Sequence, residues 1–129
     1  MTKRLSIDYD DDMKVKSVRR STRVHAASLG EYAPPAAVRE GRVEVVLVDD
    51  ETGRQESYGR LVKRRHVGSY LVQLADDVLR GMWWIIAVRV DPPRQVFIGL
   101  RHGRRVDAEH AFDHITEAEL DRGTGDWRI

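Results

Sequence analysis

Two histidines near the C-terminus have a spacing that suits metal binding. His110 and His114 are four residues apart, so both fall on one face of a helix, and Glu117 and Asp121 continue the row if that helix is unbroken. Imidazole pairs at this spacing bind zinc. The chain lacks the base of a His-Glu-x-x-His protease, however, and the row is too long to converge on one ion. We rank a metal-dependent enzyme centred on His110 and His114 third among the functions considered, and a solvated polar face is the simpler interpretation.

Three clusters of basic residues are the next candidates. Arginine suits phosphate and carboxylate groups because its guanidinium donates two parallel hydrogen bonds. The clusters could contact the phosphates of DNA or RNA, or the carboxylates of a protein partner. The formal net charge of +1 is small for a protein that binds nucleic acid nonspecifically, and solvated arginines at turns are the simpler interpretation. The clusters contain Arg19, Arg20 and Arg23; Lys63, Arg64 and Arg65; and Arg101, Arg104 and Arg105.

Two acidic turns complete the charged candidates. The spacing Asp8-x-Asp10-x-Asp12 begins like a calcium-binding loop, but methionine and arginine stand where that loop needs glycine and glutamate. In an antiparallel meander both acidic turns should lie at one end of the sheet, with the basic Lys63–His66 segment at the other. We therefore predict a charge-polarised domain that docks onto copies of itself or onto another protein. The acidic docking surface would comprise Asp10, Asp11, Asp12, Asp49, Asp50 and Glu51.

The composition narrows the chemistry further. Cysteine is absent, which removes disulfides, thiolate zinc sites and cysteine nucleophiles. Neither a Gly-x-Ser-x-Gly elbow nor a Gly-x-x-x-x-Gly-Lys phosphate loop occurs. We expect no cofactor and lean towards a protein without enzymatic activity. No run of about 18 apolar residues occurs and the N-terminus lacks the apolar core of a signal peptide, so we expect a cytoplasmic protein with no membrane partner.

The stretch from Ser69 to Arg101 should organise the fold. Its apolar spacing favours a helix over Ser69–Arg80 that ends at Gly81, and the alternative is a strand over Ser69–Ala75 followed by a turn. Met82–Val90 is apolar on both alternating faces, which predicts a central strand with its two tryptophans in the core rather than in a ligand platform. A Pro-Pro turn then leads to a returning strand over Gln95–Arg101.

The remaining segments complete a predicted α+β domain. Asp107 opens a last helix that runs to Arg122 and stops at Gly123, unless the capping box Thr116-x-x-Glu119 starts a separate, shorter helix. We predict one domain over residues 1–129, with a mainly antiparallel sheet of four to six strands packed against one or two helices. The other expected elements are strands around Leu5–Tyr9, Lys14–Val24, Arg42–Val48 and Arg54–Val67 (with a bulge at Gly59), a hairpin turn ending at Gly53, a loop over 26–40 and a tail over 123–129.

Three functions remain in order of preference. The first is a non-catalytic interaction or assembly subunit with charge-polarised ends, in which Arg64, Arg65, Arg104 and Arg105 meet the acidic turns of another copy. The second is a nucleic-acid-binding module that uses the same arginines on phosphates. The third is the metal-dependent enzyme centred on the two histidines.

Overall fold

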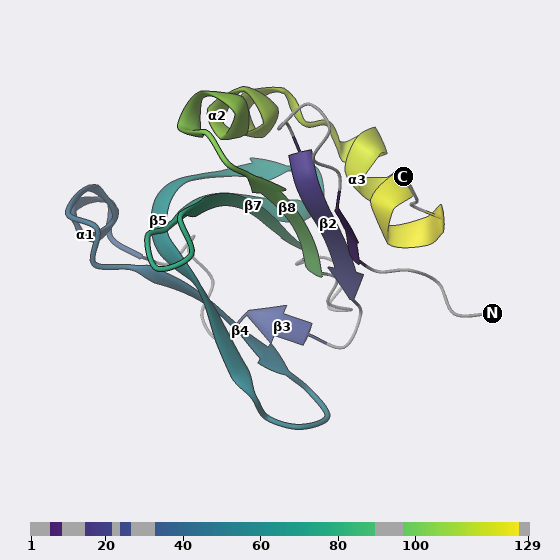
Figure 1. The fold of residues 1–129 in the computed structure, drawn as a ribbon, viewed down its shortest axis with the longest axis horizontal. Coiled ribbons are helices and arrows are strands. Elements are labelled where there is room, and N and C mark those ends of the chain that lie inside the picture. The colour runs from purple at the N-terminus through teal and green to yellow at the C-terminus, as the bar shows by residue number, and fades with distance from the viewer. Residues whose placement is uncertain (1–5, 9–14, 22–23, 27–32, 90–96, 127–129) are drawn as a thin grey trace.

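The computed structural model of the protein describes residues 6–8, 15–21, 24–26, 33–89 and 97–126. These residues form one antiparallel sheet and three helices (Figure 1). In chain order the elements are β1 (Ser6–Asp8), β2 (Val15–Ser21), β3 (Val24–Ala26), α1 (Pro35–Arg39), β4 (Glu44–Asp49), β5 (Gln55–Val67), β6 (Tyr70–Asp77), β7 (Met82–Arg89), β8 (Phe97–His102), α2 (Arg105–His114) and α3 (Glu117–Asp126).

The strands from β3 to β8 form a meander in which each strand pairs with the next one described along the chain. The full order in the sheet is β1-β2-β8-β7-β6-β5-β4-β3, and every described pairing is antiparallel. This confirms the α+β class with an antiparallel sheet, and six strands have six or more residues, a number within the predicted four to six. Two three-residue segments, β1 and β3, extend its edges.

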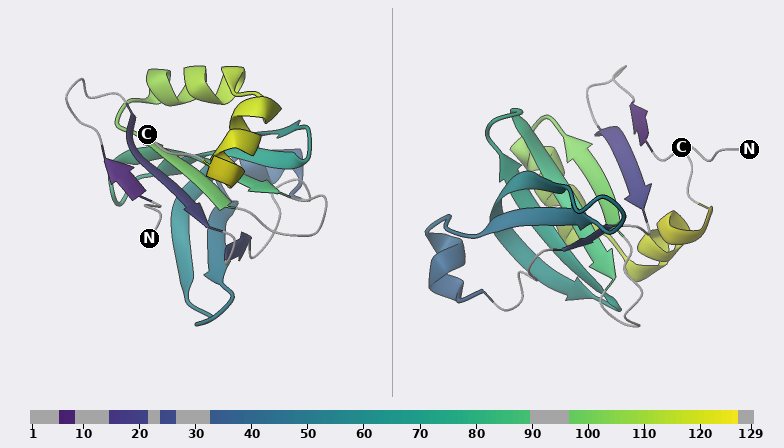
Figure 2. Two further views of the ribbon diagram at one scale, coloured as in Figure 1. Left: turned by 90° about the vertical axis from the view of Figure 1, so that its right-hand side faces the viewer. Right: turned by 90° about the horizontal axis from the view of Figure 1, so that it is seen from below.

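The sheet is strongly curled, because one stretch of chain pairs with both of its sides. β2 pairs with β8 and β3 pairs with β4, yet β2 ends at Ser21 and β3 begins at Val24. Three Cα–Cα steps of about 3.8 Å place those two residues at most about 11 Å apart. The far sides of the meander must therefore approach each other, and the views in Figures 1 and 2 show the resulting curvature.

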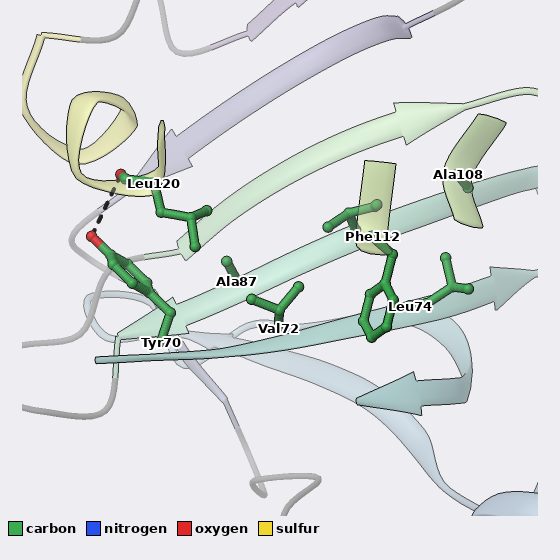
Figure 3. Packing of buried hydrophobic residues seen from close by; sticks show 8 residues of the cluster. Tyr70, Val72, Leu74, Ala87, Ala108, Phe112 and Leu120 are labelled. Atoms are coloured by element: carbon green, nitrogen blue, oxygen red, sulfur yellow. Dashed lines mark hydrogen bonds between the residues drawn. The ribbon is translucent and has the colours of Figure 1, made fainter. Parts of the chain in front are cut away.

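The curled sheet has a hydrophobic cluster on each face. On the outer face, strands β6 and β7 pack against α2 and α3, and the cluster includes Tyr70, Leu74, Phe112 and Leu120 (Figure 3). On the inner face, a second cluster joins β4, β5, β6 and β7. Because β7 contributes to both clusters, the prediction of a central strand with two apolar faces is confirmed.

The predicted helix over Ser69–Arg80 is wrong, and the alternative of a strand followed by a turn is confirmed. β6 spans Tyr70–Asp77, and a turn over residues 78–81 joins it to β7. The apolar residues of this stretch satisfy a helical spacing only because a strand buried on both faces needs apolar side chains at nearly every position. Gly81 has a φ of +69°, and it closes this turn instead of ending a helix.

The long strand β5 bends at the predicted bulge. Two residue steps on β4, from Glu44 to Val46, face three steps on β5, from Ser57 to Arg60, so β5 carries one extra residue here. Gly59 lies within this bulge with a φ of +102°. The hairpin turn that precedes β5 is also as predicted, with Gly53 at a φ of +74° and its N–H donating to the Asp49 carbonyl over 2.8 Å.

The last helical stretch is two helices, as the capping-box alternative predicts. α2 ends at His114, and Thr116 precedes α3 with its Oγ1 accepting the N–H of Glu119 over 3.2 Å. The carboxylate of Glu119 accepts the N–H of Thr116 over 3.0 Å in return. The predicted stop at Gly123 is wrong because α3 continues to Asp126. The predicted loop over 26–40 contains the short helix α1.

Candidate functional site

The basic cluster on β5 is divided between the two faces of the sheet. Lys63 and Arg65 pair across the ladder with Leu74 and Val72, which belong to the outer, helix-side cluster. Arg64 lies between them in sequence and therefore points to the inner face. The three residues cannot form a single phosphate-binding surface on this strand.

Arg65 has a structural role that its sequence context did not predict. Its Nε and one terminal nitrogen donate to the Phe112 carbonyl over 3.0 and 2.7 Å, and the same terminal nitrogen donates to the Ile115 carbonyl over 3.1 Å. Its guanidinium carbon also lies 5.5 Å from the centre of the Phe112 ring. A helix leaves its last carbonyls without partners inside the helix, and Arg65 fills this need at the end of α2.

Glu109 gathers two of the other basic candidates. Its carboxylate accepts a hydrogen bond from the Arg105 Nε over 2.9 Å and lies 3.8 Å from the Lys63 Nζ. The hydrogen bond from Arg105, aided by the charge of Lys63, lowers the pKa of the Glu109 carboxyl below its ordinary value. Arg105 also lies over the Trp83 ring, 5.2 Å from its centre.

Arg80, in the β6–β7 turn, forms ion pairs with two carboxylates. Arg80 contacts Asp77 at 2.7 Å and Glu56 at 3.1 Å, and its guanidinium also lies 5.8 Å from the centre of the Tyr58 ring. The Nε1 of Trp84 donates to the same Asp77 carboxylate over 3.1 Å. Sequence reasoning missed this network, because nothing in the spacing of its members indicates that they meet.

Trp84 lies in the core, as predicted from the apolar run around it. It is 5% exposed, and its ring meets that of Tyr58 edge to face with the centres 5.0 Å apart. Trp83 is half-buried on the opposite face, under the start of α2. Arg101 pairs with Trp84 across the ladder and is half-buried.

Three exposed apolar side chains lie at one end of the sheet. Val78 and Leu79 are 66% and 99% exposed in the β6–β7 turn, and Val106 is 58% exposed in the first turn of α2. These three are the exposed large hydrophobic residues of the described part of the chain. Trp83 pairs with His102 immediately before α2, so the turn and the start of the helix lie at the same end of neighbouring strands.

Two arginines border these apolar residues. Arg104 and Arg105 stand at the start of α2 with side chains 70% and 57% exposed. Arg104 contacts Asp107 at 3.6 Å, the longer of the two helix-surface ion pairs made by these arginines. We call the group formed by Val78, Leu79, Arg104, Arg105 and Val106 the apolar end.

The acidic turn between β4 and β5 projects from the body of the domain. The paired ends of β4 and β5 extend as an arm on the side away from α2, as two views show (Figures 1 and 2). Asp49 shapes its tip by accepting the N–H groups of Glu51 and Thr52 over 2.8 and 3.2 Å. Asp50 and Glu51 are exposed there, and we call these two residues the arm tip.

Some of the predicted charged sites lie outside the described part of the structure. These are Asp10, Asp11, Asp12 and Arg23, together with the side chains of Arg19 and Arg20, whose backbone belongs to β2. Among the described candidates, the structure brings together Lys63 and Arg105, which come from two different basic clusters. Both lie beside the Glu109 carboxylate.

The two histidines are adjacent, but the acidic residues expected beside them are elsewhere. The rings of His110 and His114 are stacked with centres 4.2 Å apart and planes 28° apart. Glu117 belongs to α3, where its carboxylate accepts the N–H of Ser69 over 3.2 Å, and Asp121 accepts the Tyr70 hydroxyl over 3.0 Å. Among the described residues, no group of three or more histidine, cysteine or acidic side chains could hold a metal.

Comparisons with known proteins give no assignment. No protein-family model matches the chain, and neither a curated protein nor a solved structure shows significant similarity to it. Within the described residues, no helix has both the length and the apolar character needed to cross a membrane.

Proposed function

We propose that this chain is a non-catalytic assembly subunit whose copies associate head to tail. In this arrangement the apolar end of one copy contacts the arm tip of the next. The observation that carries the proposal is that Val78, Leu79 and Val106, the exposed large hydrophobic residues of the described part of the chain, all lie at one end of the sheet.

The charges on the two surfaces are complementary. Arg104 and Arg105 give the apolar end its positive charge, and Asp50 and Glu51 form the tip of an arm that projects on the side away from α2 (Figures 1 and 2). Opposite charges at the rim of a contact favour the correct orientation and speed association more than they add affinity. Because the two surfaces differ, the contact is heterologous and can add further copies instead of closing into a pair.

The expected affinity is modest. Full burial of a leucine or valine side chain contributes about 1.5–3 kcal/mol, and an exposed ion pair about 0.2–1 kcal/mol. Much of this gain offsets the freedom lost on association, so a dissociation constant on the order of 100 µM is reasonable. Assembly should therefore depend on protein concentration and weaken as salt screens the ion pairs.

The nucleic-acid hypothesis has less support. Lys63 and Arg65 would be needed on such a surface, and each contacts a group of this chain. Both lie on the face that α2 covers, whereas Arg64 faces the inner side of the sheet.

Light scattering over a range of concentrations and at low and high salt tests the proposal. The weight-average mass should rise with concentration, and this rise should be smaller at high salt. A mass equal to that of one chain at every concentration up to about ten times the expected dissociation constant would overturn the proposal.

A mixing experiment tests the head-to-tail arrangement. Leu79→Glu disables the apolar end, and Asp50→Lys combined with Glu51→Lys disables the arm tip. Each variant alone should remain monomeric, whereas their mixture should form pairs and nothing larger, because one intact surface remains on each. Val38→Ala changes a residue of α1 that belongs to neither surface, so it controls for unspecific effects of a substitution and should assemble as the wild type does.

A further inference from the structure

The two stacked histidines on α2 have a geometry that assembly does not require. Both side chains are exposed on the helix surface. The Nδ1 of His114 lies 2.8 Å from the His110 carbonyl oxygen. A carbonyl oxygen can only accept a hydrogen bond, so Nδ1 must carry the proton and donate it. In the neutral ring the other nitrogen, Nε2, then holds a lone pair.

This hydrogen bond reproduces the outer shell of a metal-bound histidine. Histidines that bind metals almost always donate their second ring nitrogen to a carbonyl or carboxylate, which fixes the tautomer and the orientation of the ring. In His114 the tautomer and the ring are therefore already set for coordination through Nε2. His110 supplies a second imidazole from one helical turn earlier.

We propose that His110 and His114 form a two-imidazole site for a borderline transition-metal ion, with water completing the coordination. This goes beyond the proposed assembly and does not depend on it. Two nitrogens bound at about 2.05 Å to one tetrahedral ion are about 3.3 Å apart. The stacked rings have centres 4.2 Å apart, so the exposed ring of His110 must rotate about its side-chain bonds before its nitrogen meets an ion held by Nε2 of His114.

The position on the helix also favours a cation. His114 is the last residue of α2, where the aligned peptide dipoles place partial negative charge. Imidazole ligands select Cu²⁺, Ni²⁺ and Zn²⁺ over Mg²⁺ and Ca²⁺, which prefer oxygen. The affinity should follow the usual order for divalent ions, with Cu²⁺ tightest and with Ni²⁺ and Zn²⁺ weaker.

Titration of the untagged protein with each metal ion alone tests the site. Calorimetry should show one Cu²⁺ bound per chain, and paramagnetic Cu²⁺ should broaden the ring signals of His110 and His114 in NMR spectra before those of other histidines. His110→Gln and His114→Gln should each weaken Cu²⁺ binding by more than about tenfold, since loss of an outer-shell partner alone costs about 10–100-fold.

A matched variant separates this site from general surface binding. His66→Gln removes another exposed histidine, on β5, and should leave the Cu²⁺ affinity unchanged. Circular dichroism verifies that all three variants are folded. The proposal is overturned if the His110 and His114 variants bind Cu²⁺ as tightly as the wild type does, if His66→Gln causes the larger loss, or if no Cu²⁺ binds.

Discussion

Replacement of Gly59 by alanine should destabilise the fold more than the same replacement of any described glycine that lies in a turn. Gly59 lies in the β5 bulge with a φ of +102°, where side chains other than hydrogen are strained. A Cβ atom at this position would overlap the backbone carbonyl of Asp76 on β6 and approach the Asp77 Cα to 2.6 Å. Both neighbours are backbone atoms of a central strand, so neither can rotate away.

The magnitude follows from two terms. The unfavourable backbone conformation costs about 1–2 kcal/mol in a residue with a Cβ atom. Relief of the overlap requires β5 and β6 to separate locally, and the loss of one or two ladder hydrogen bonds costs about 0.5–1.5 kcal/mol each. The sum is about 1.5–5 kcal/mol. At the usual 0.05–0.15 kcal/mol per residue, a chain of this length has a free energy of unfolding of about 6–19 kcal/mol. The variant should therefore still fold, with a clearly lower free energy of unfolding.

Urea denaturation followed by tryptophan fluorescence measures the effect, because Trp83 and Trp84 lie on the central strand β7. Gly81→Ala is the matched control: its φ of +69° imposes the conformational cost, but an added Cβ has no neighbour within 4 Å. The control should lose about 1–2 kcal/mol only. If Gly59→Ala and Gly81→Ala lower the free energy of unfolding equally, the steric argument at the bulge is refuted.

Three further predictions concern the helices. Arg65→Met should lower the free energy of unfolding by about 2–3 kcal/mol, because two carbonyls at the end of α2 lose a charged donor; urea denaturation measures it. Thr116→Ala should cost about 1 kcal/mol, since the first turn of α3 loses its cap, and faster amide exchange at that turn should accompany the loss. Arg105→Gln should raise the pKa of the Glu109 carboxyl more than Lys63→Met does, because the hydrogen bond from Arg105 is the largest cause of its lowering; an NMR titration of the Glu109 carboxyl tests this.

The lowered pKa of Glu109 makes the stability of the fold depend on pH in a defined direction. The folded-state pKa of Glu109 is depressed, so its contribution to stability is present above the pKa that it has in the unfolded chain. That contribution is lost as the pH falls through the lower, folded-state value. Glu109→Gln should therefore unfold with a weaker dependence on pH in the acidic range, and an unchanged dependence would contradict the assignment.

Controls for the two helix variants come from neighbouring positions. Arg64→Met changes the residue beside Arg65 on the opposite face of β5 and should cost less than Arg65→Met. Ala118→Ser alters the first turn of α3 at an exposed position and should leave the cap intact. Equal losses for Arg65→Met and Arg64→Met would show that the carbonyl contacts at α2 contribute nothing specific.

Features that depend on local pattern were predicted from the sequence. Alternation identified the two apolar faces of β7, and turn chemistry identified the hairpin around Gly53 and the bulge at Gly59. The capping box at Thr116 specified a helix start whose partners are three residues apart. In each case the residues that fix the structure are close together in the chain.

Features that depend on distant partners were not predictable. The β6 segment has the same apolar spacing as a helix, and only its neighbours β5 and β7 decide between the two. Arg65 looked like one member of a surface cluster, yet its partners lie 47 and 50 residues away, at the C-terminal end of α2 and the residue that follows it. The curl of the sheet likewise follows from pairings at both sides of the meander that no single segment encodes.

The pairing of β2 with β8 has a consequence during synthesis on the ribosome. Arg20 of β2 pairs with Ile98 of β8, so this part of β2 emerges 78 residues before its partner (98 − 20). At about 5–20 residues per second, that interval lasts roughly 4–16 s. Throughout this time one hydrogen-bonding edge of β2 has no partner strand, which leaves the segment open to pairing with other chains.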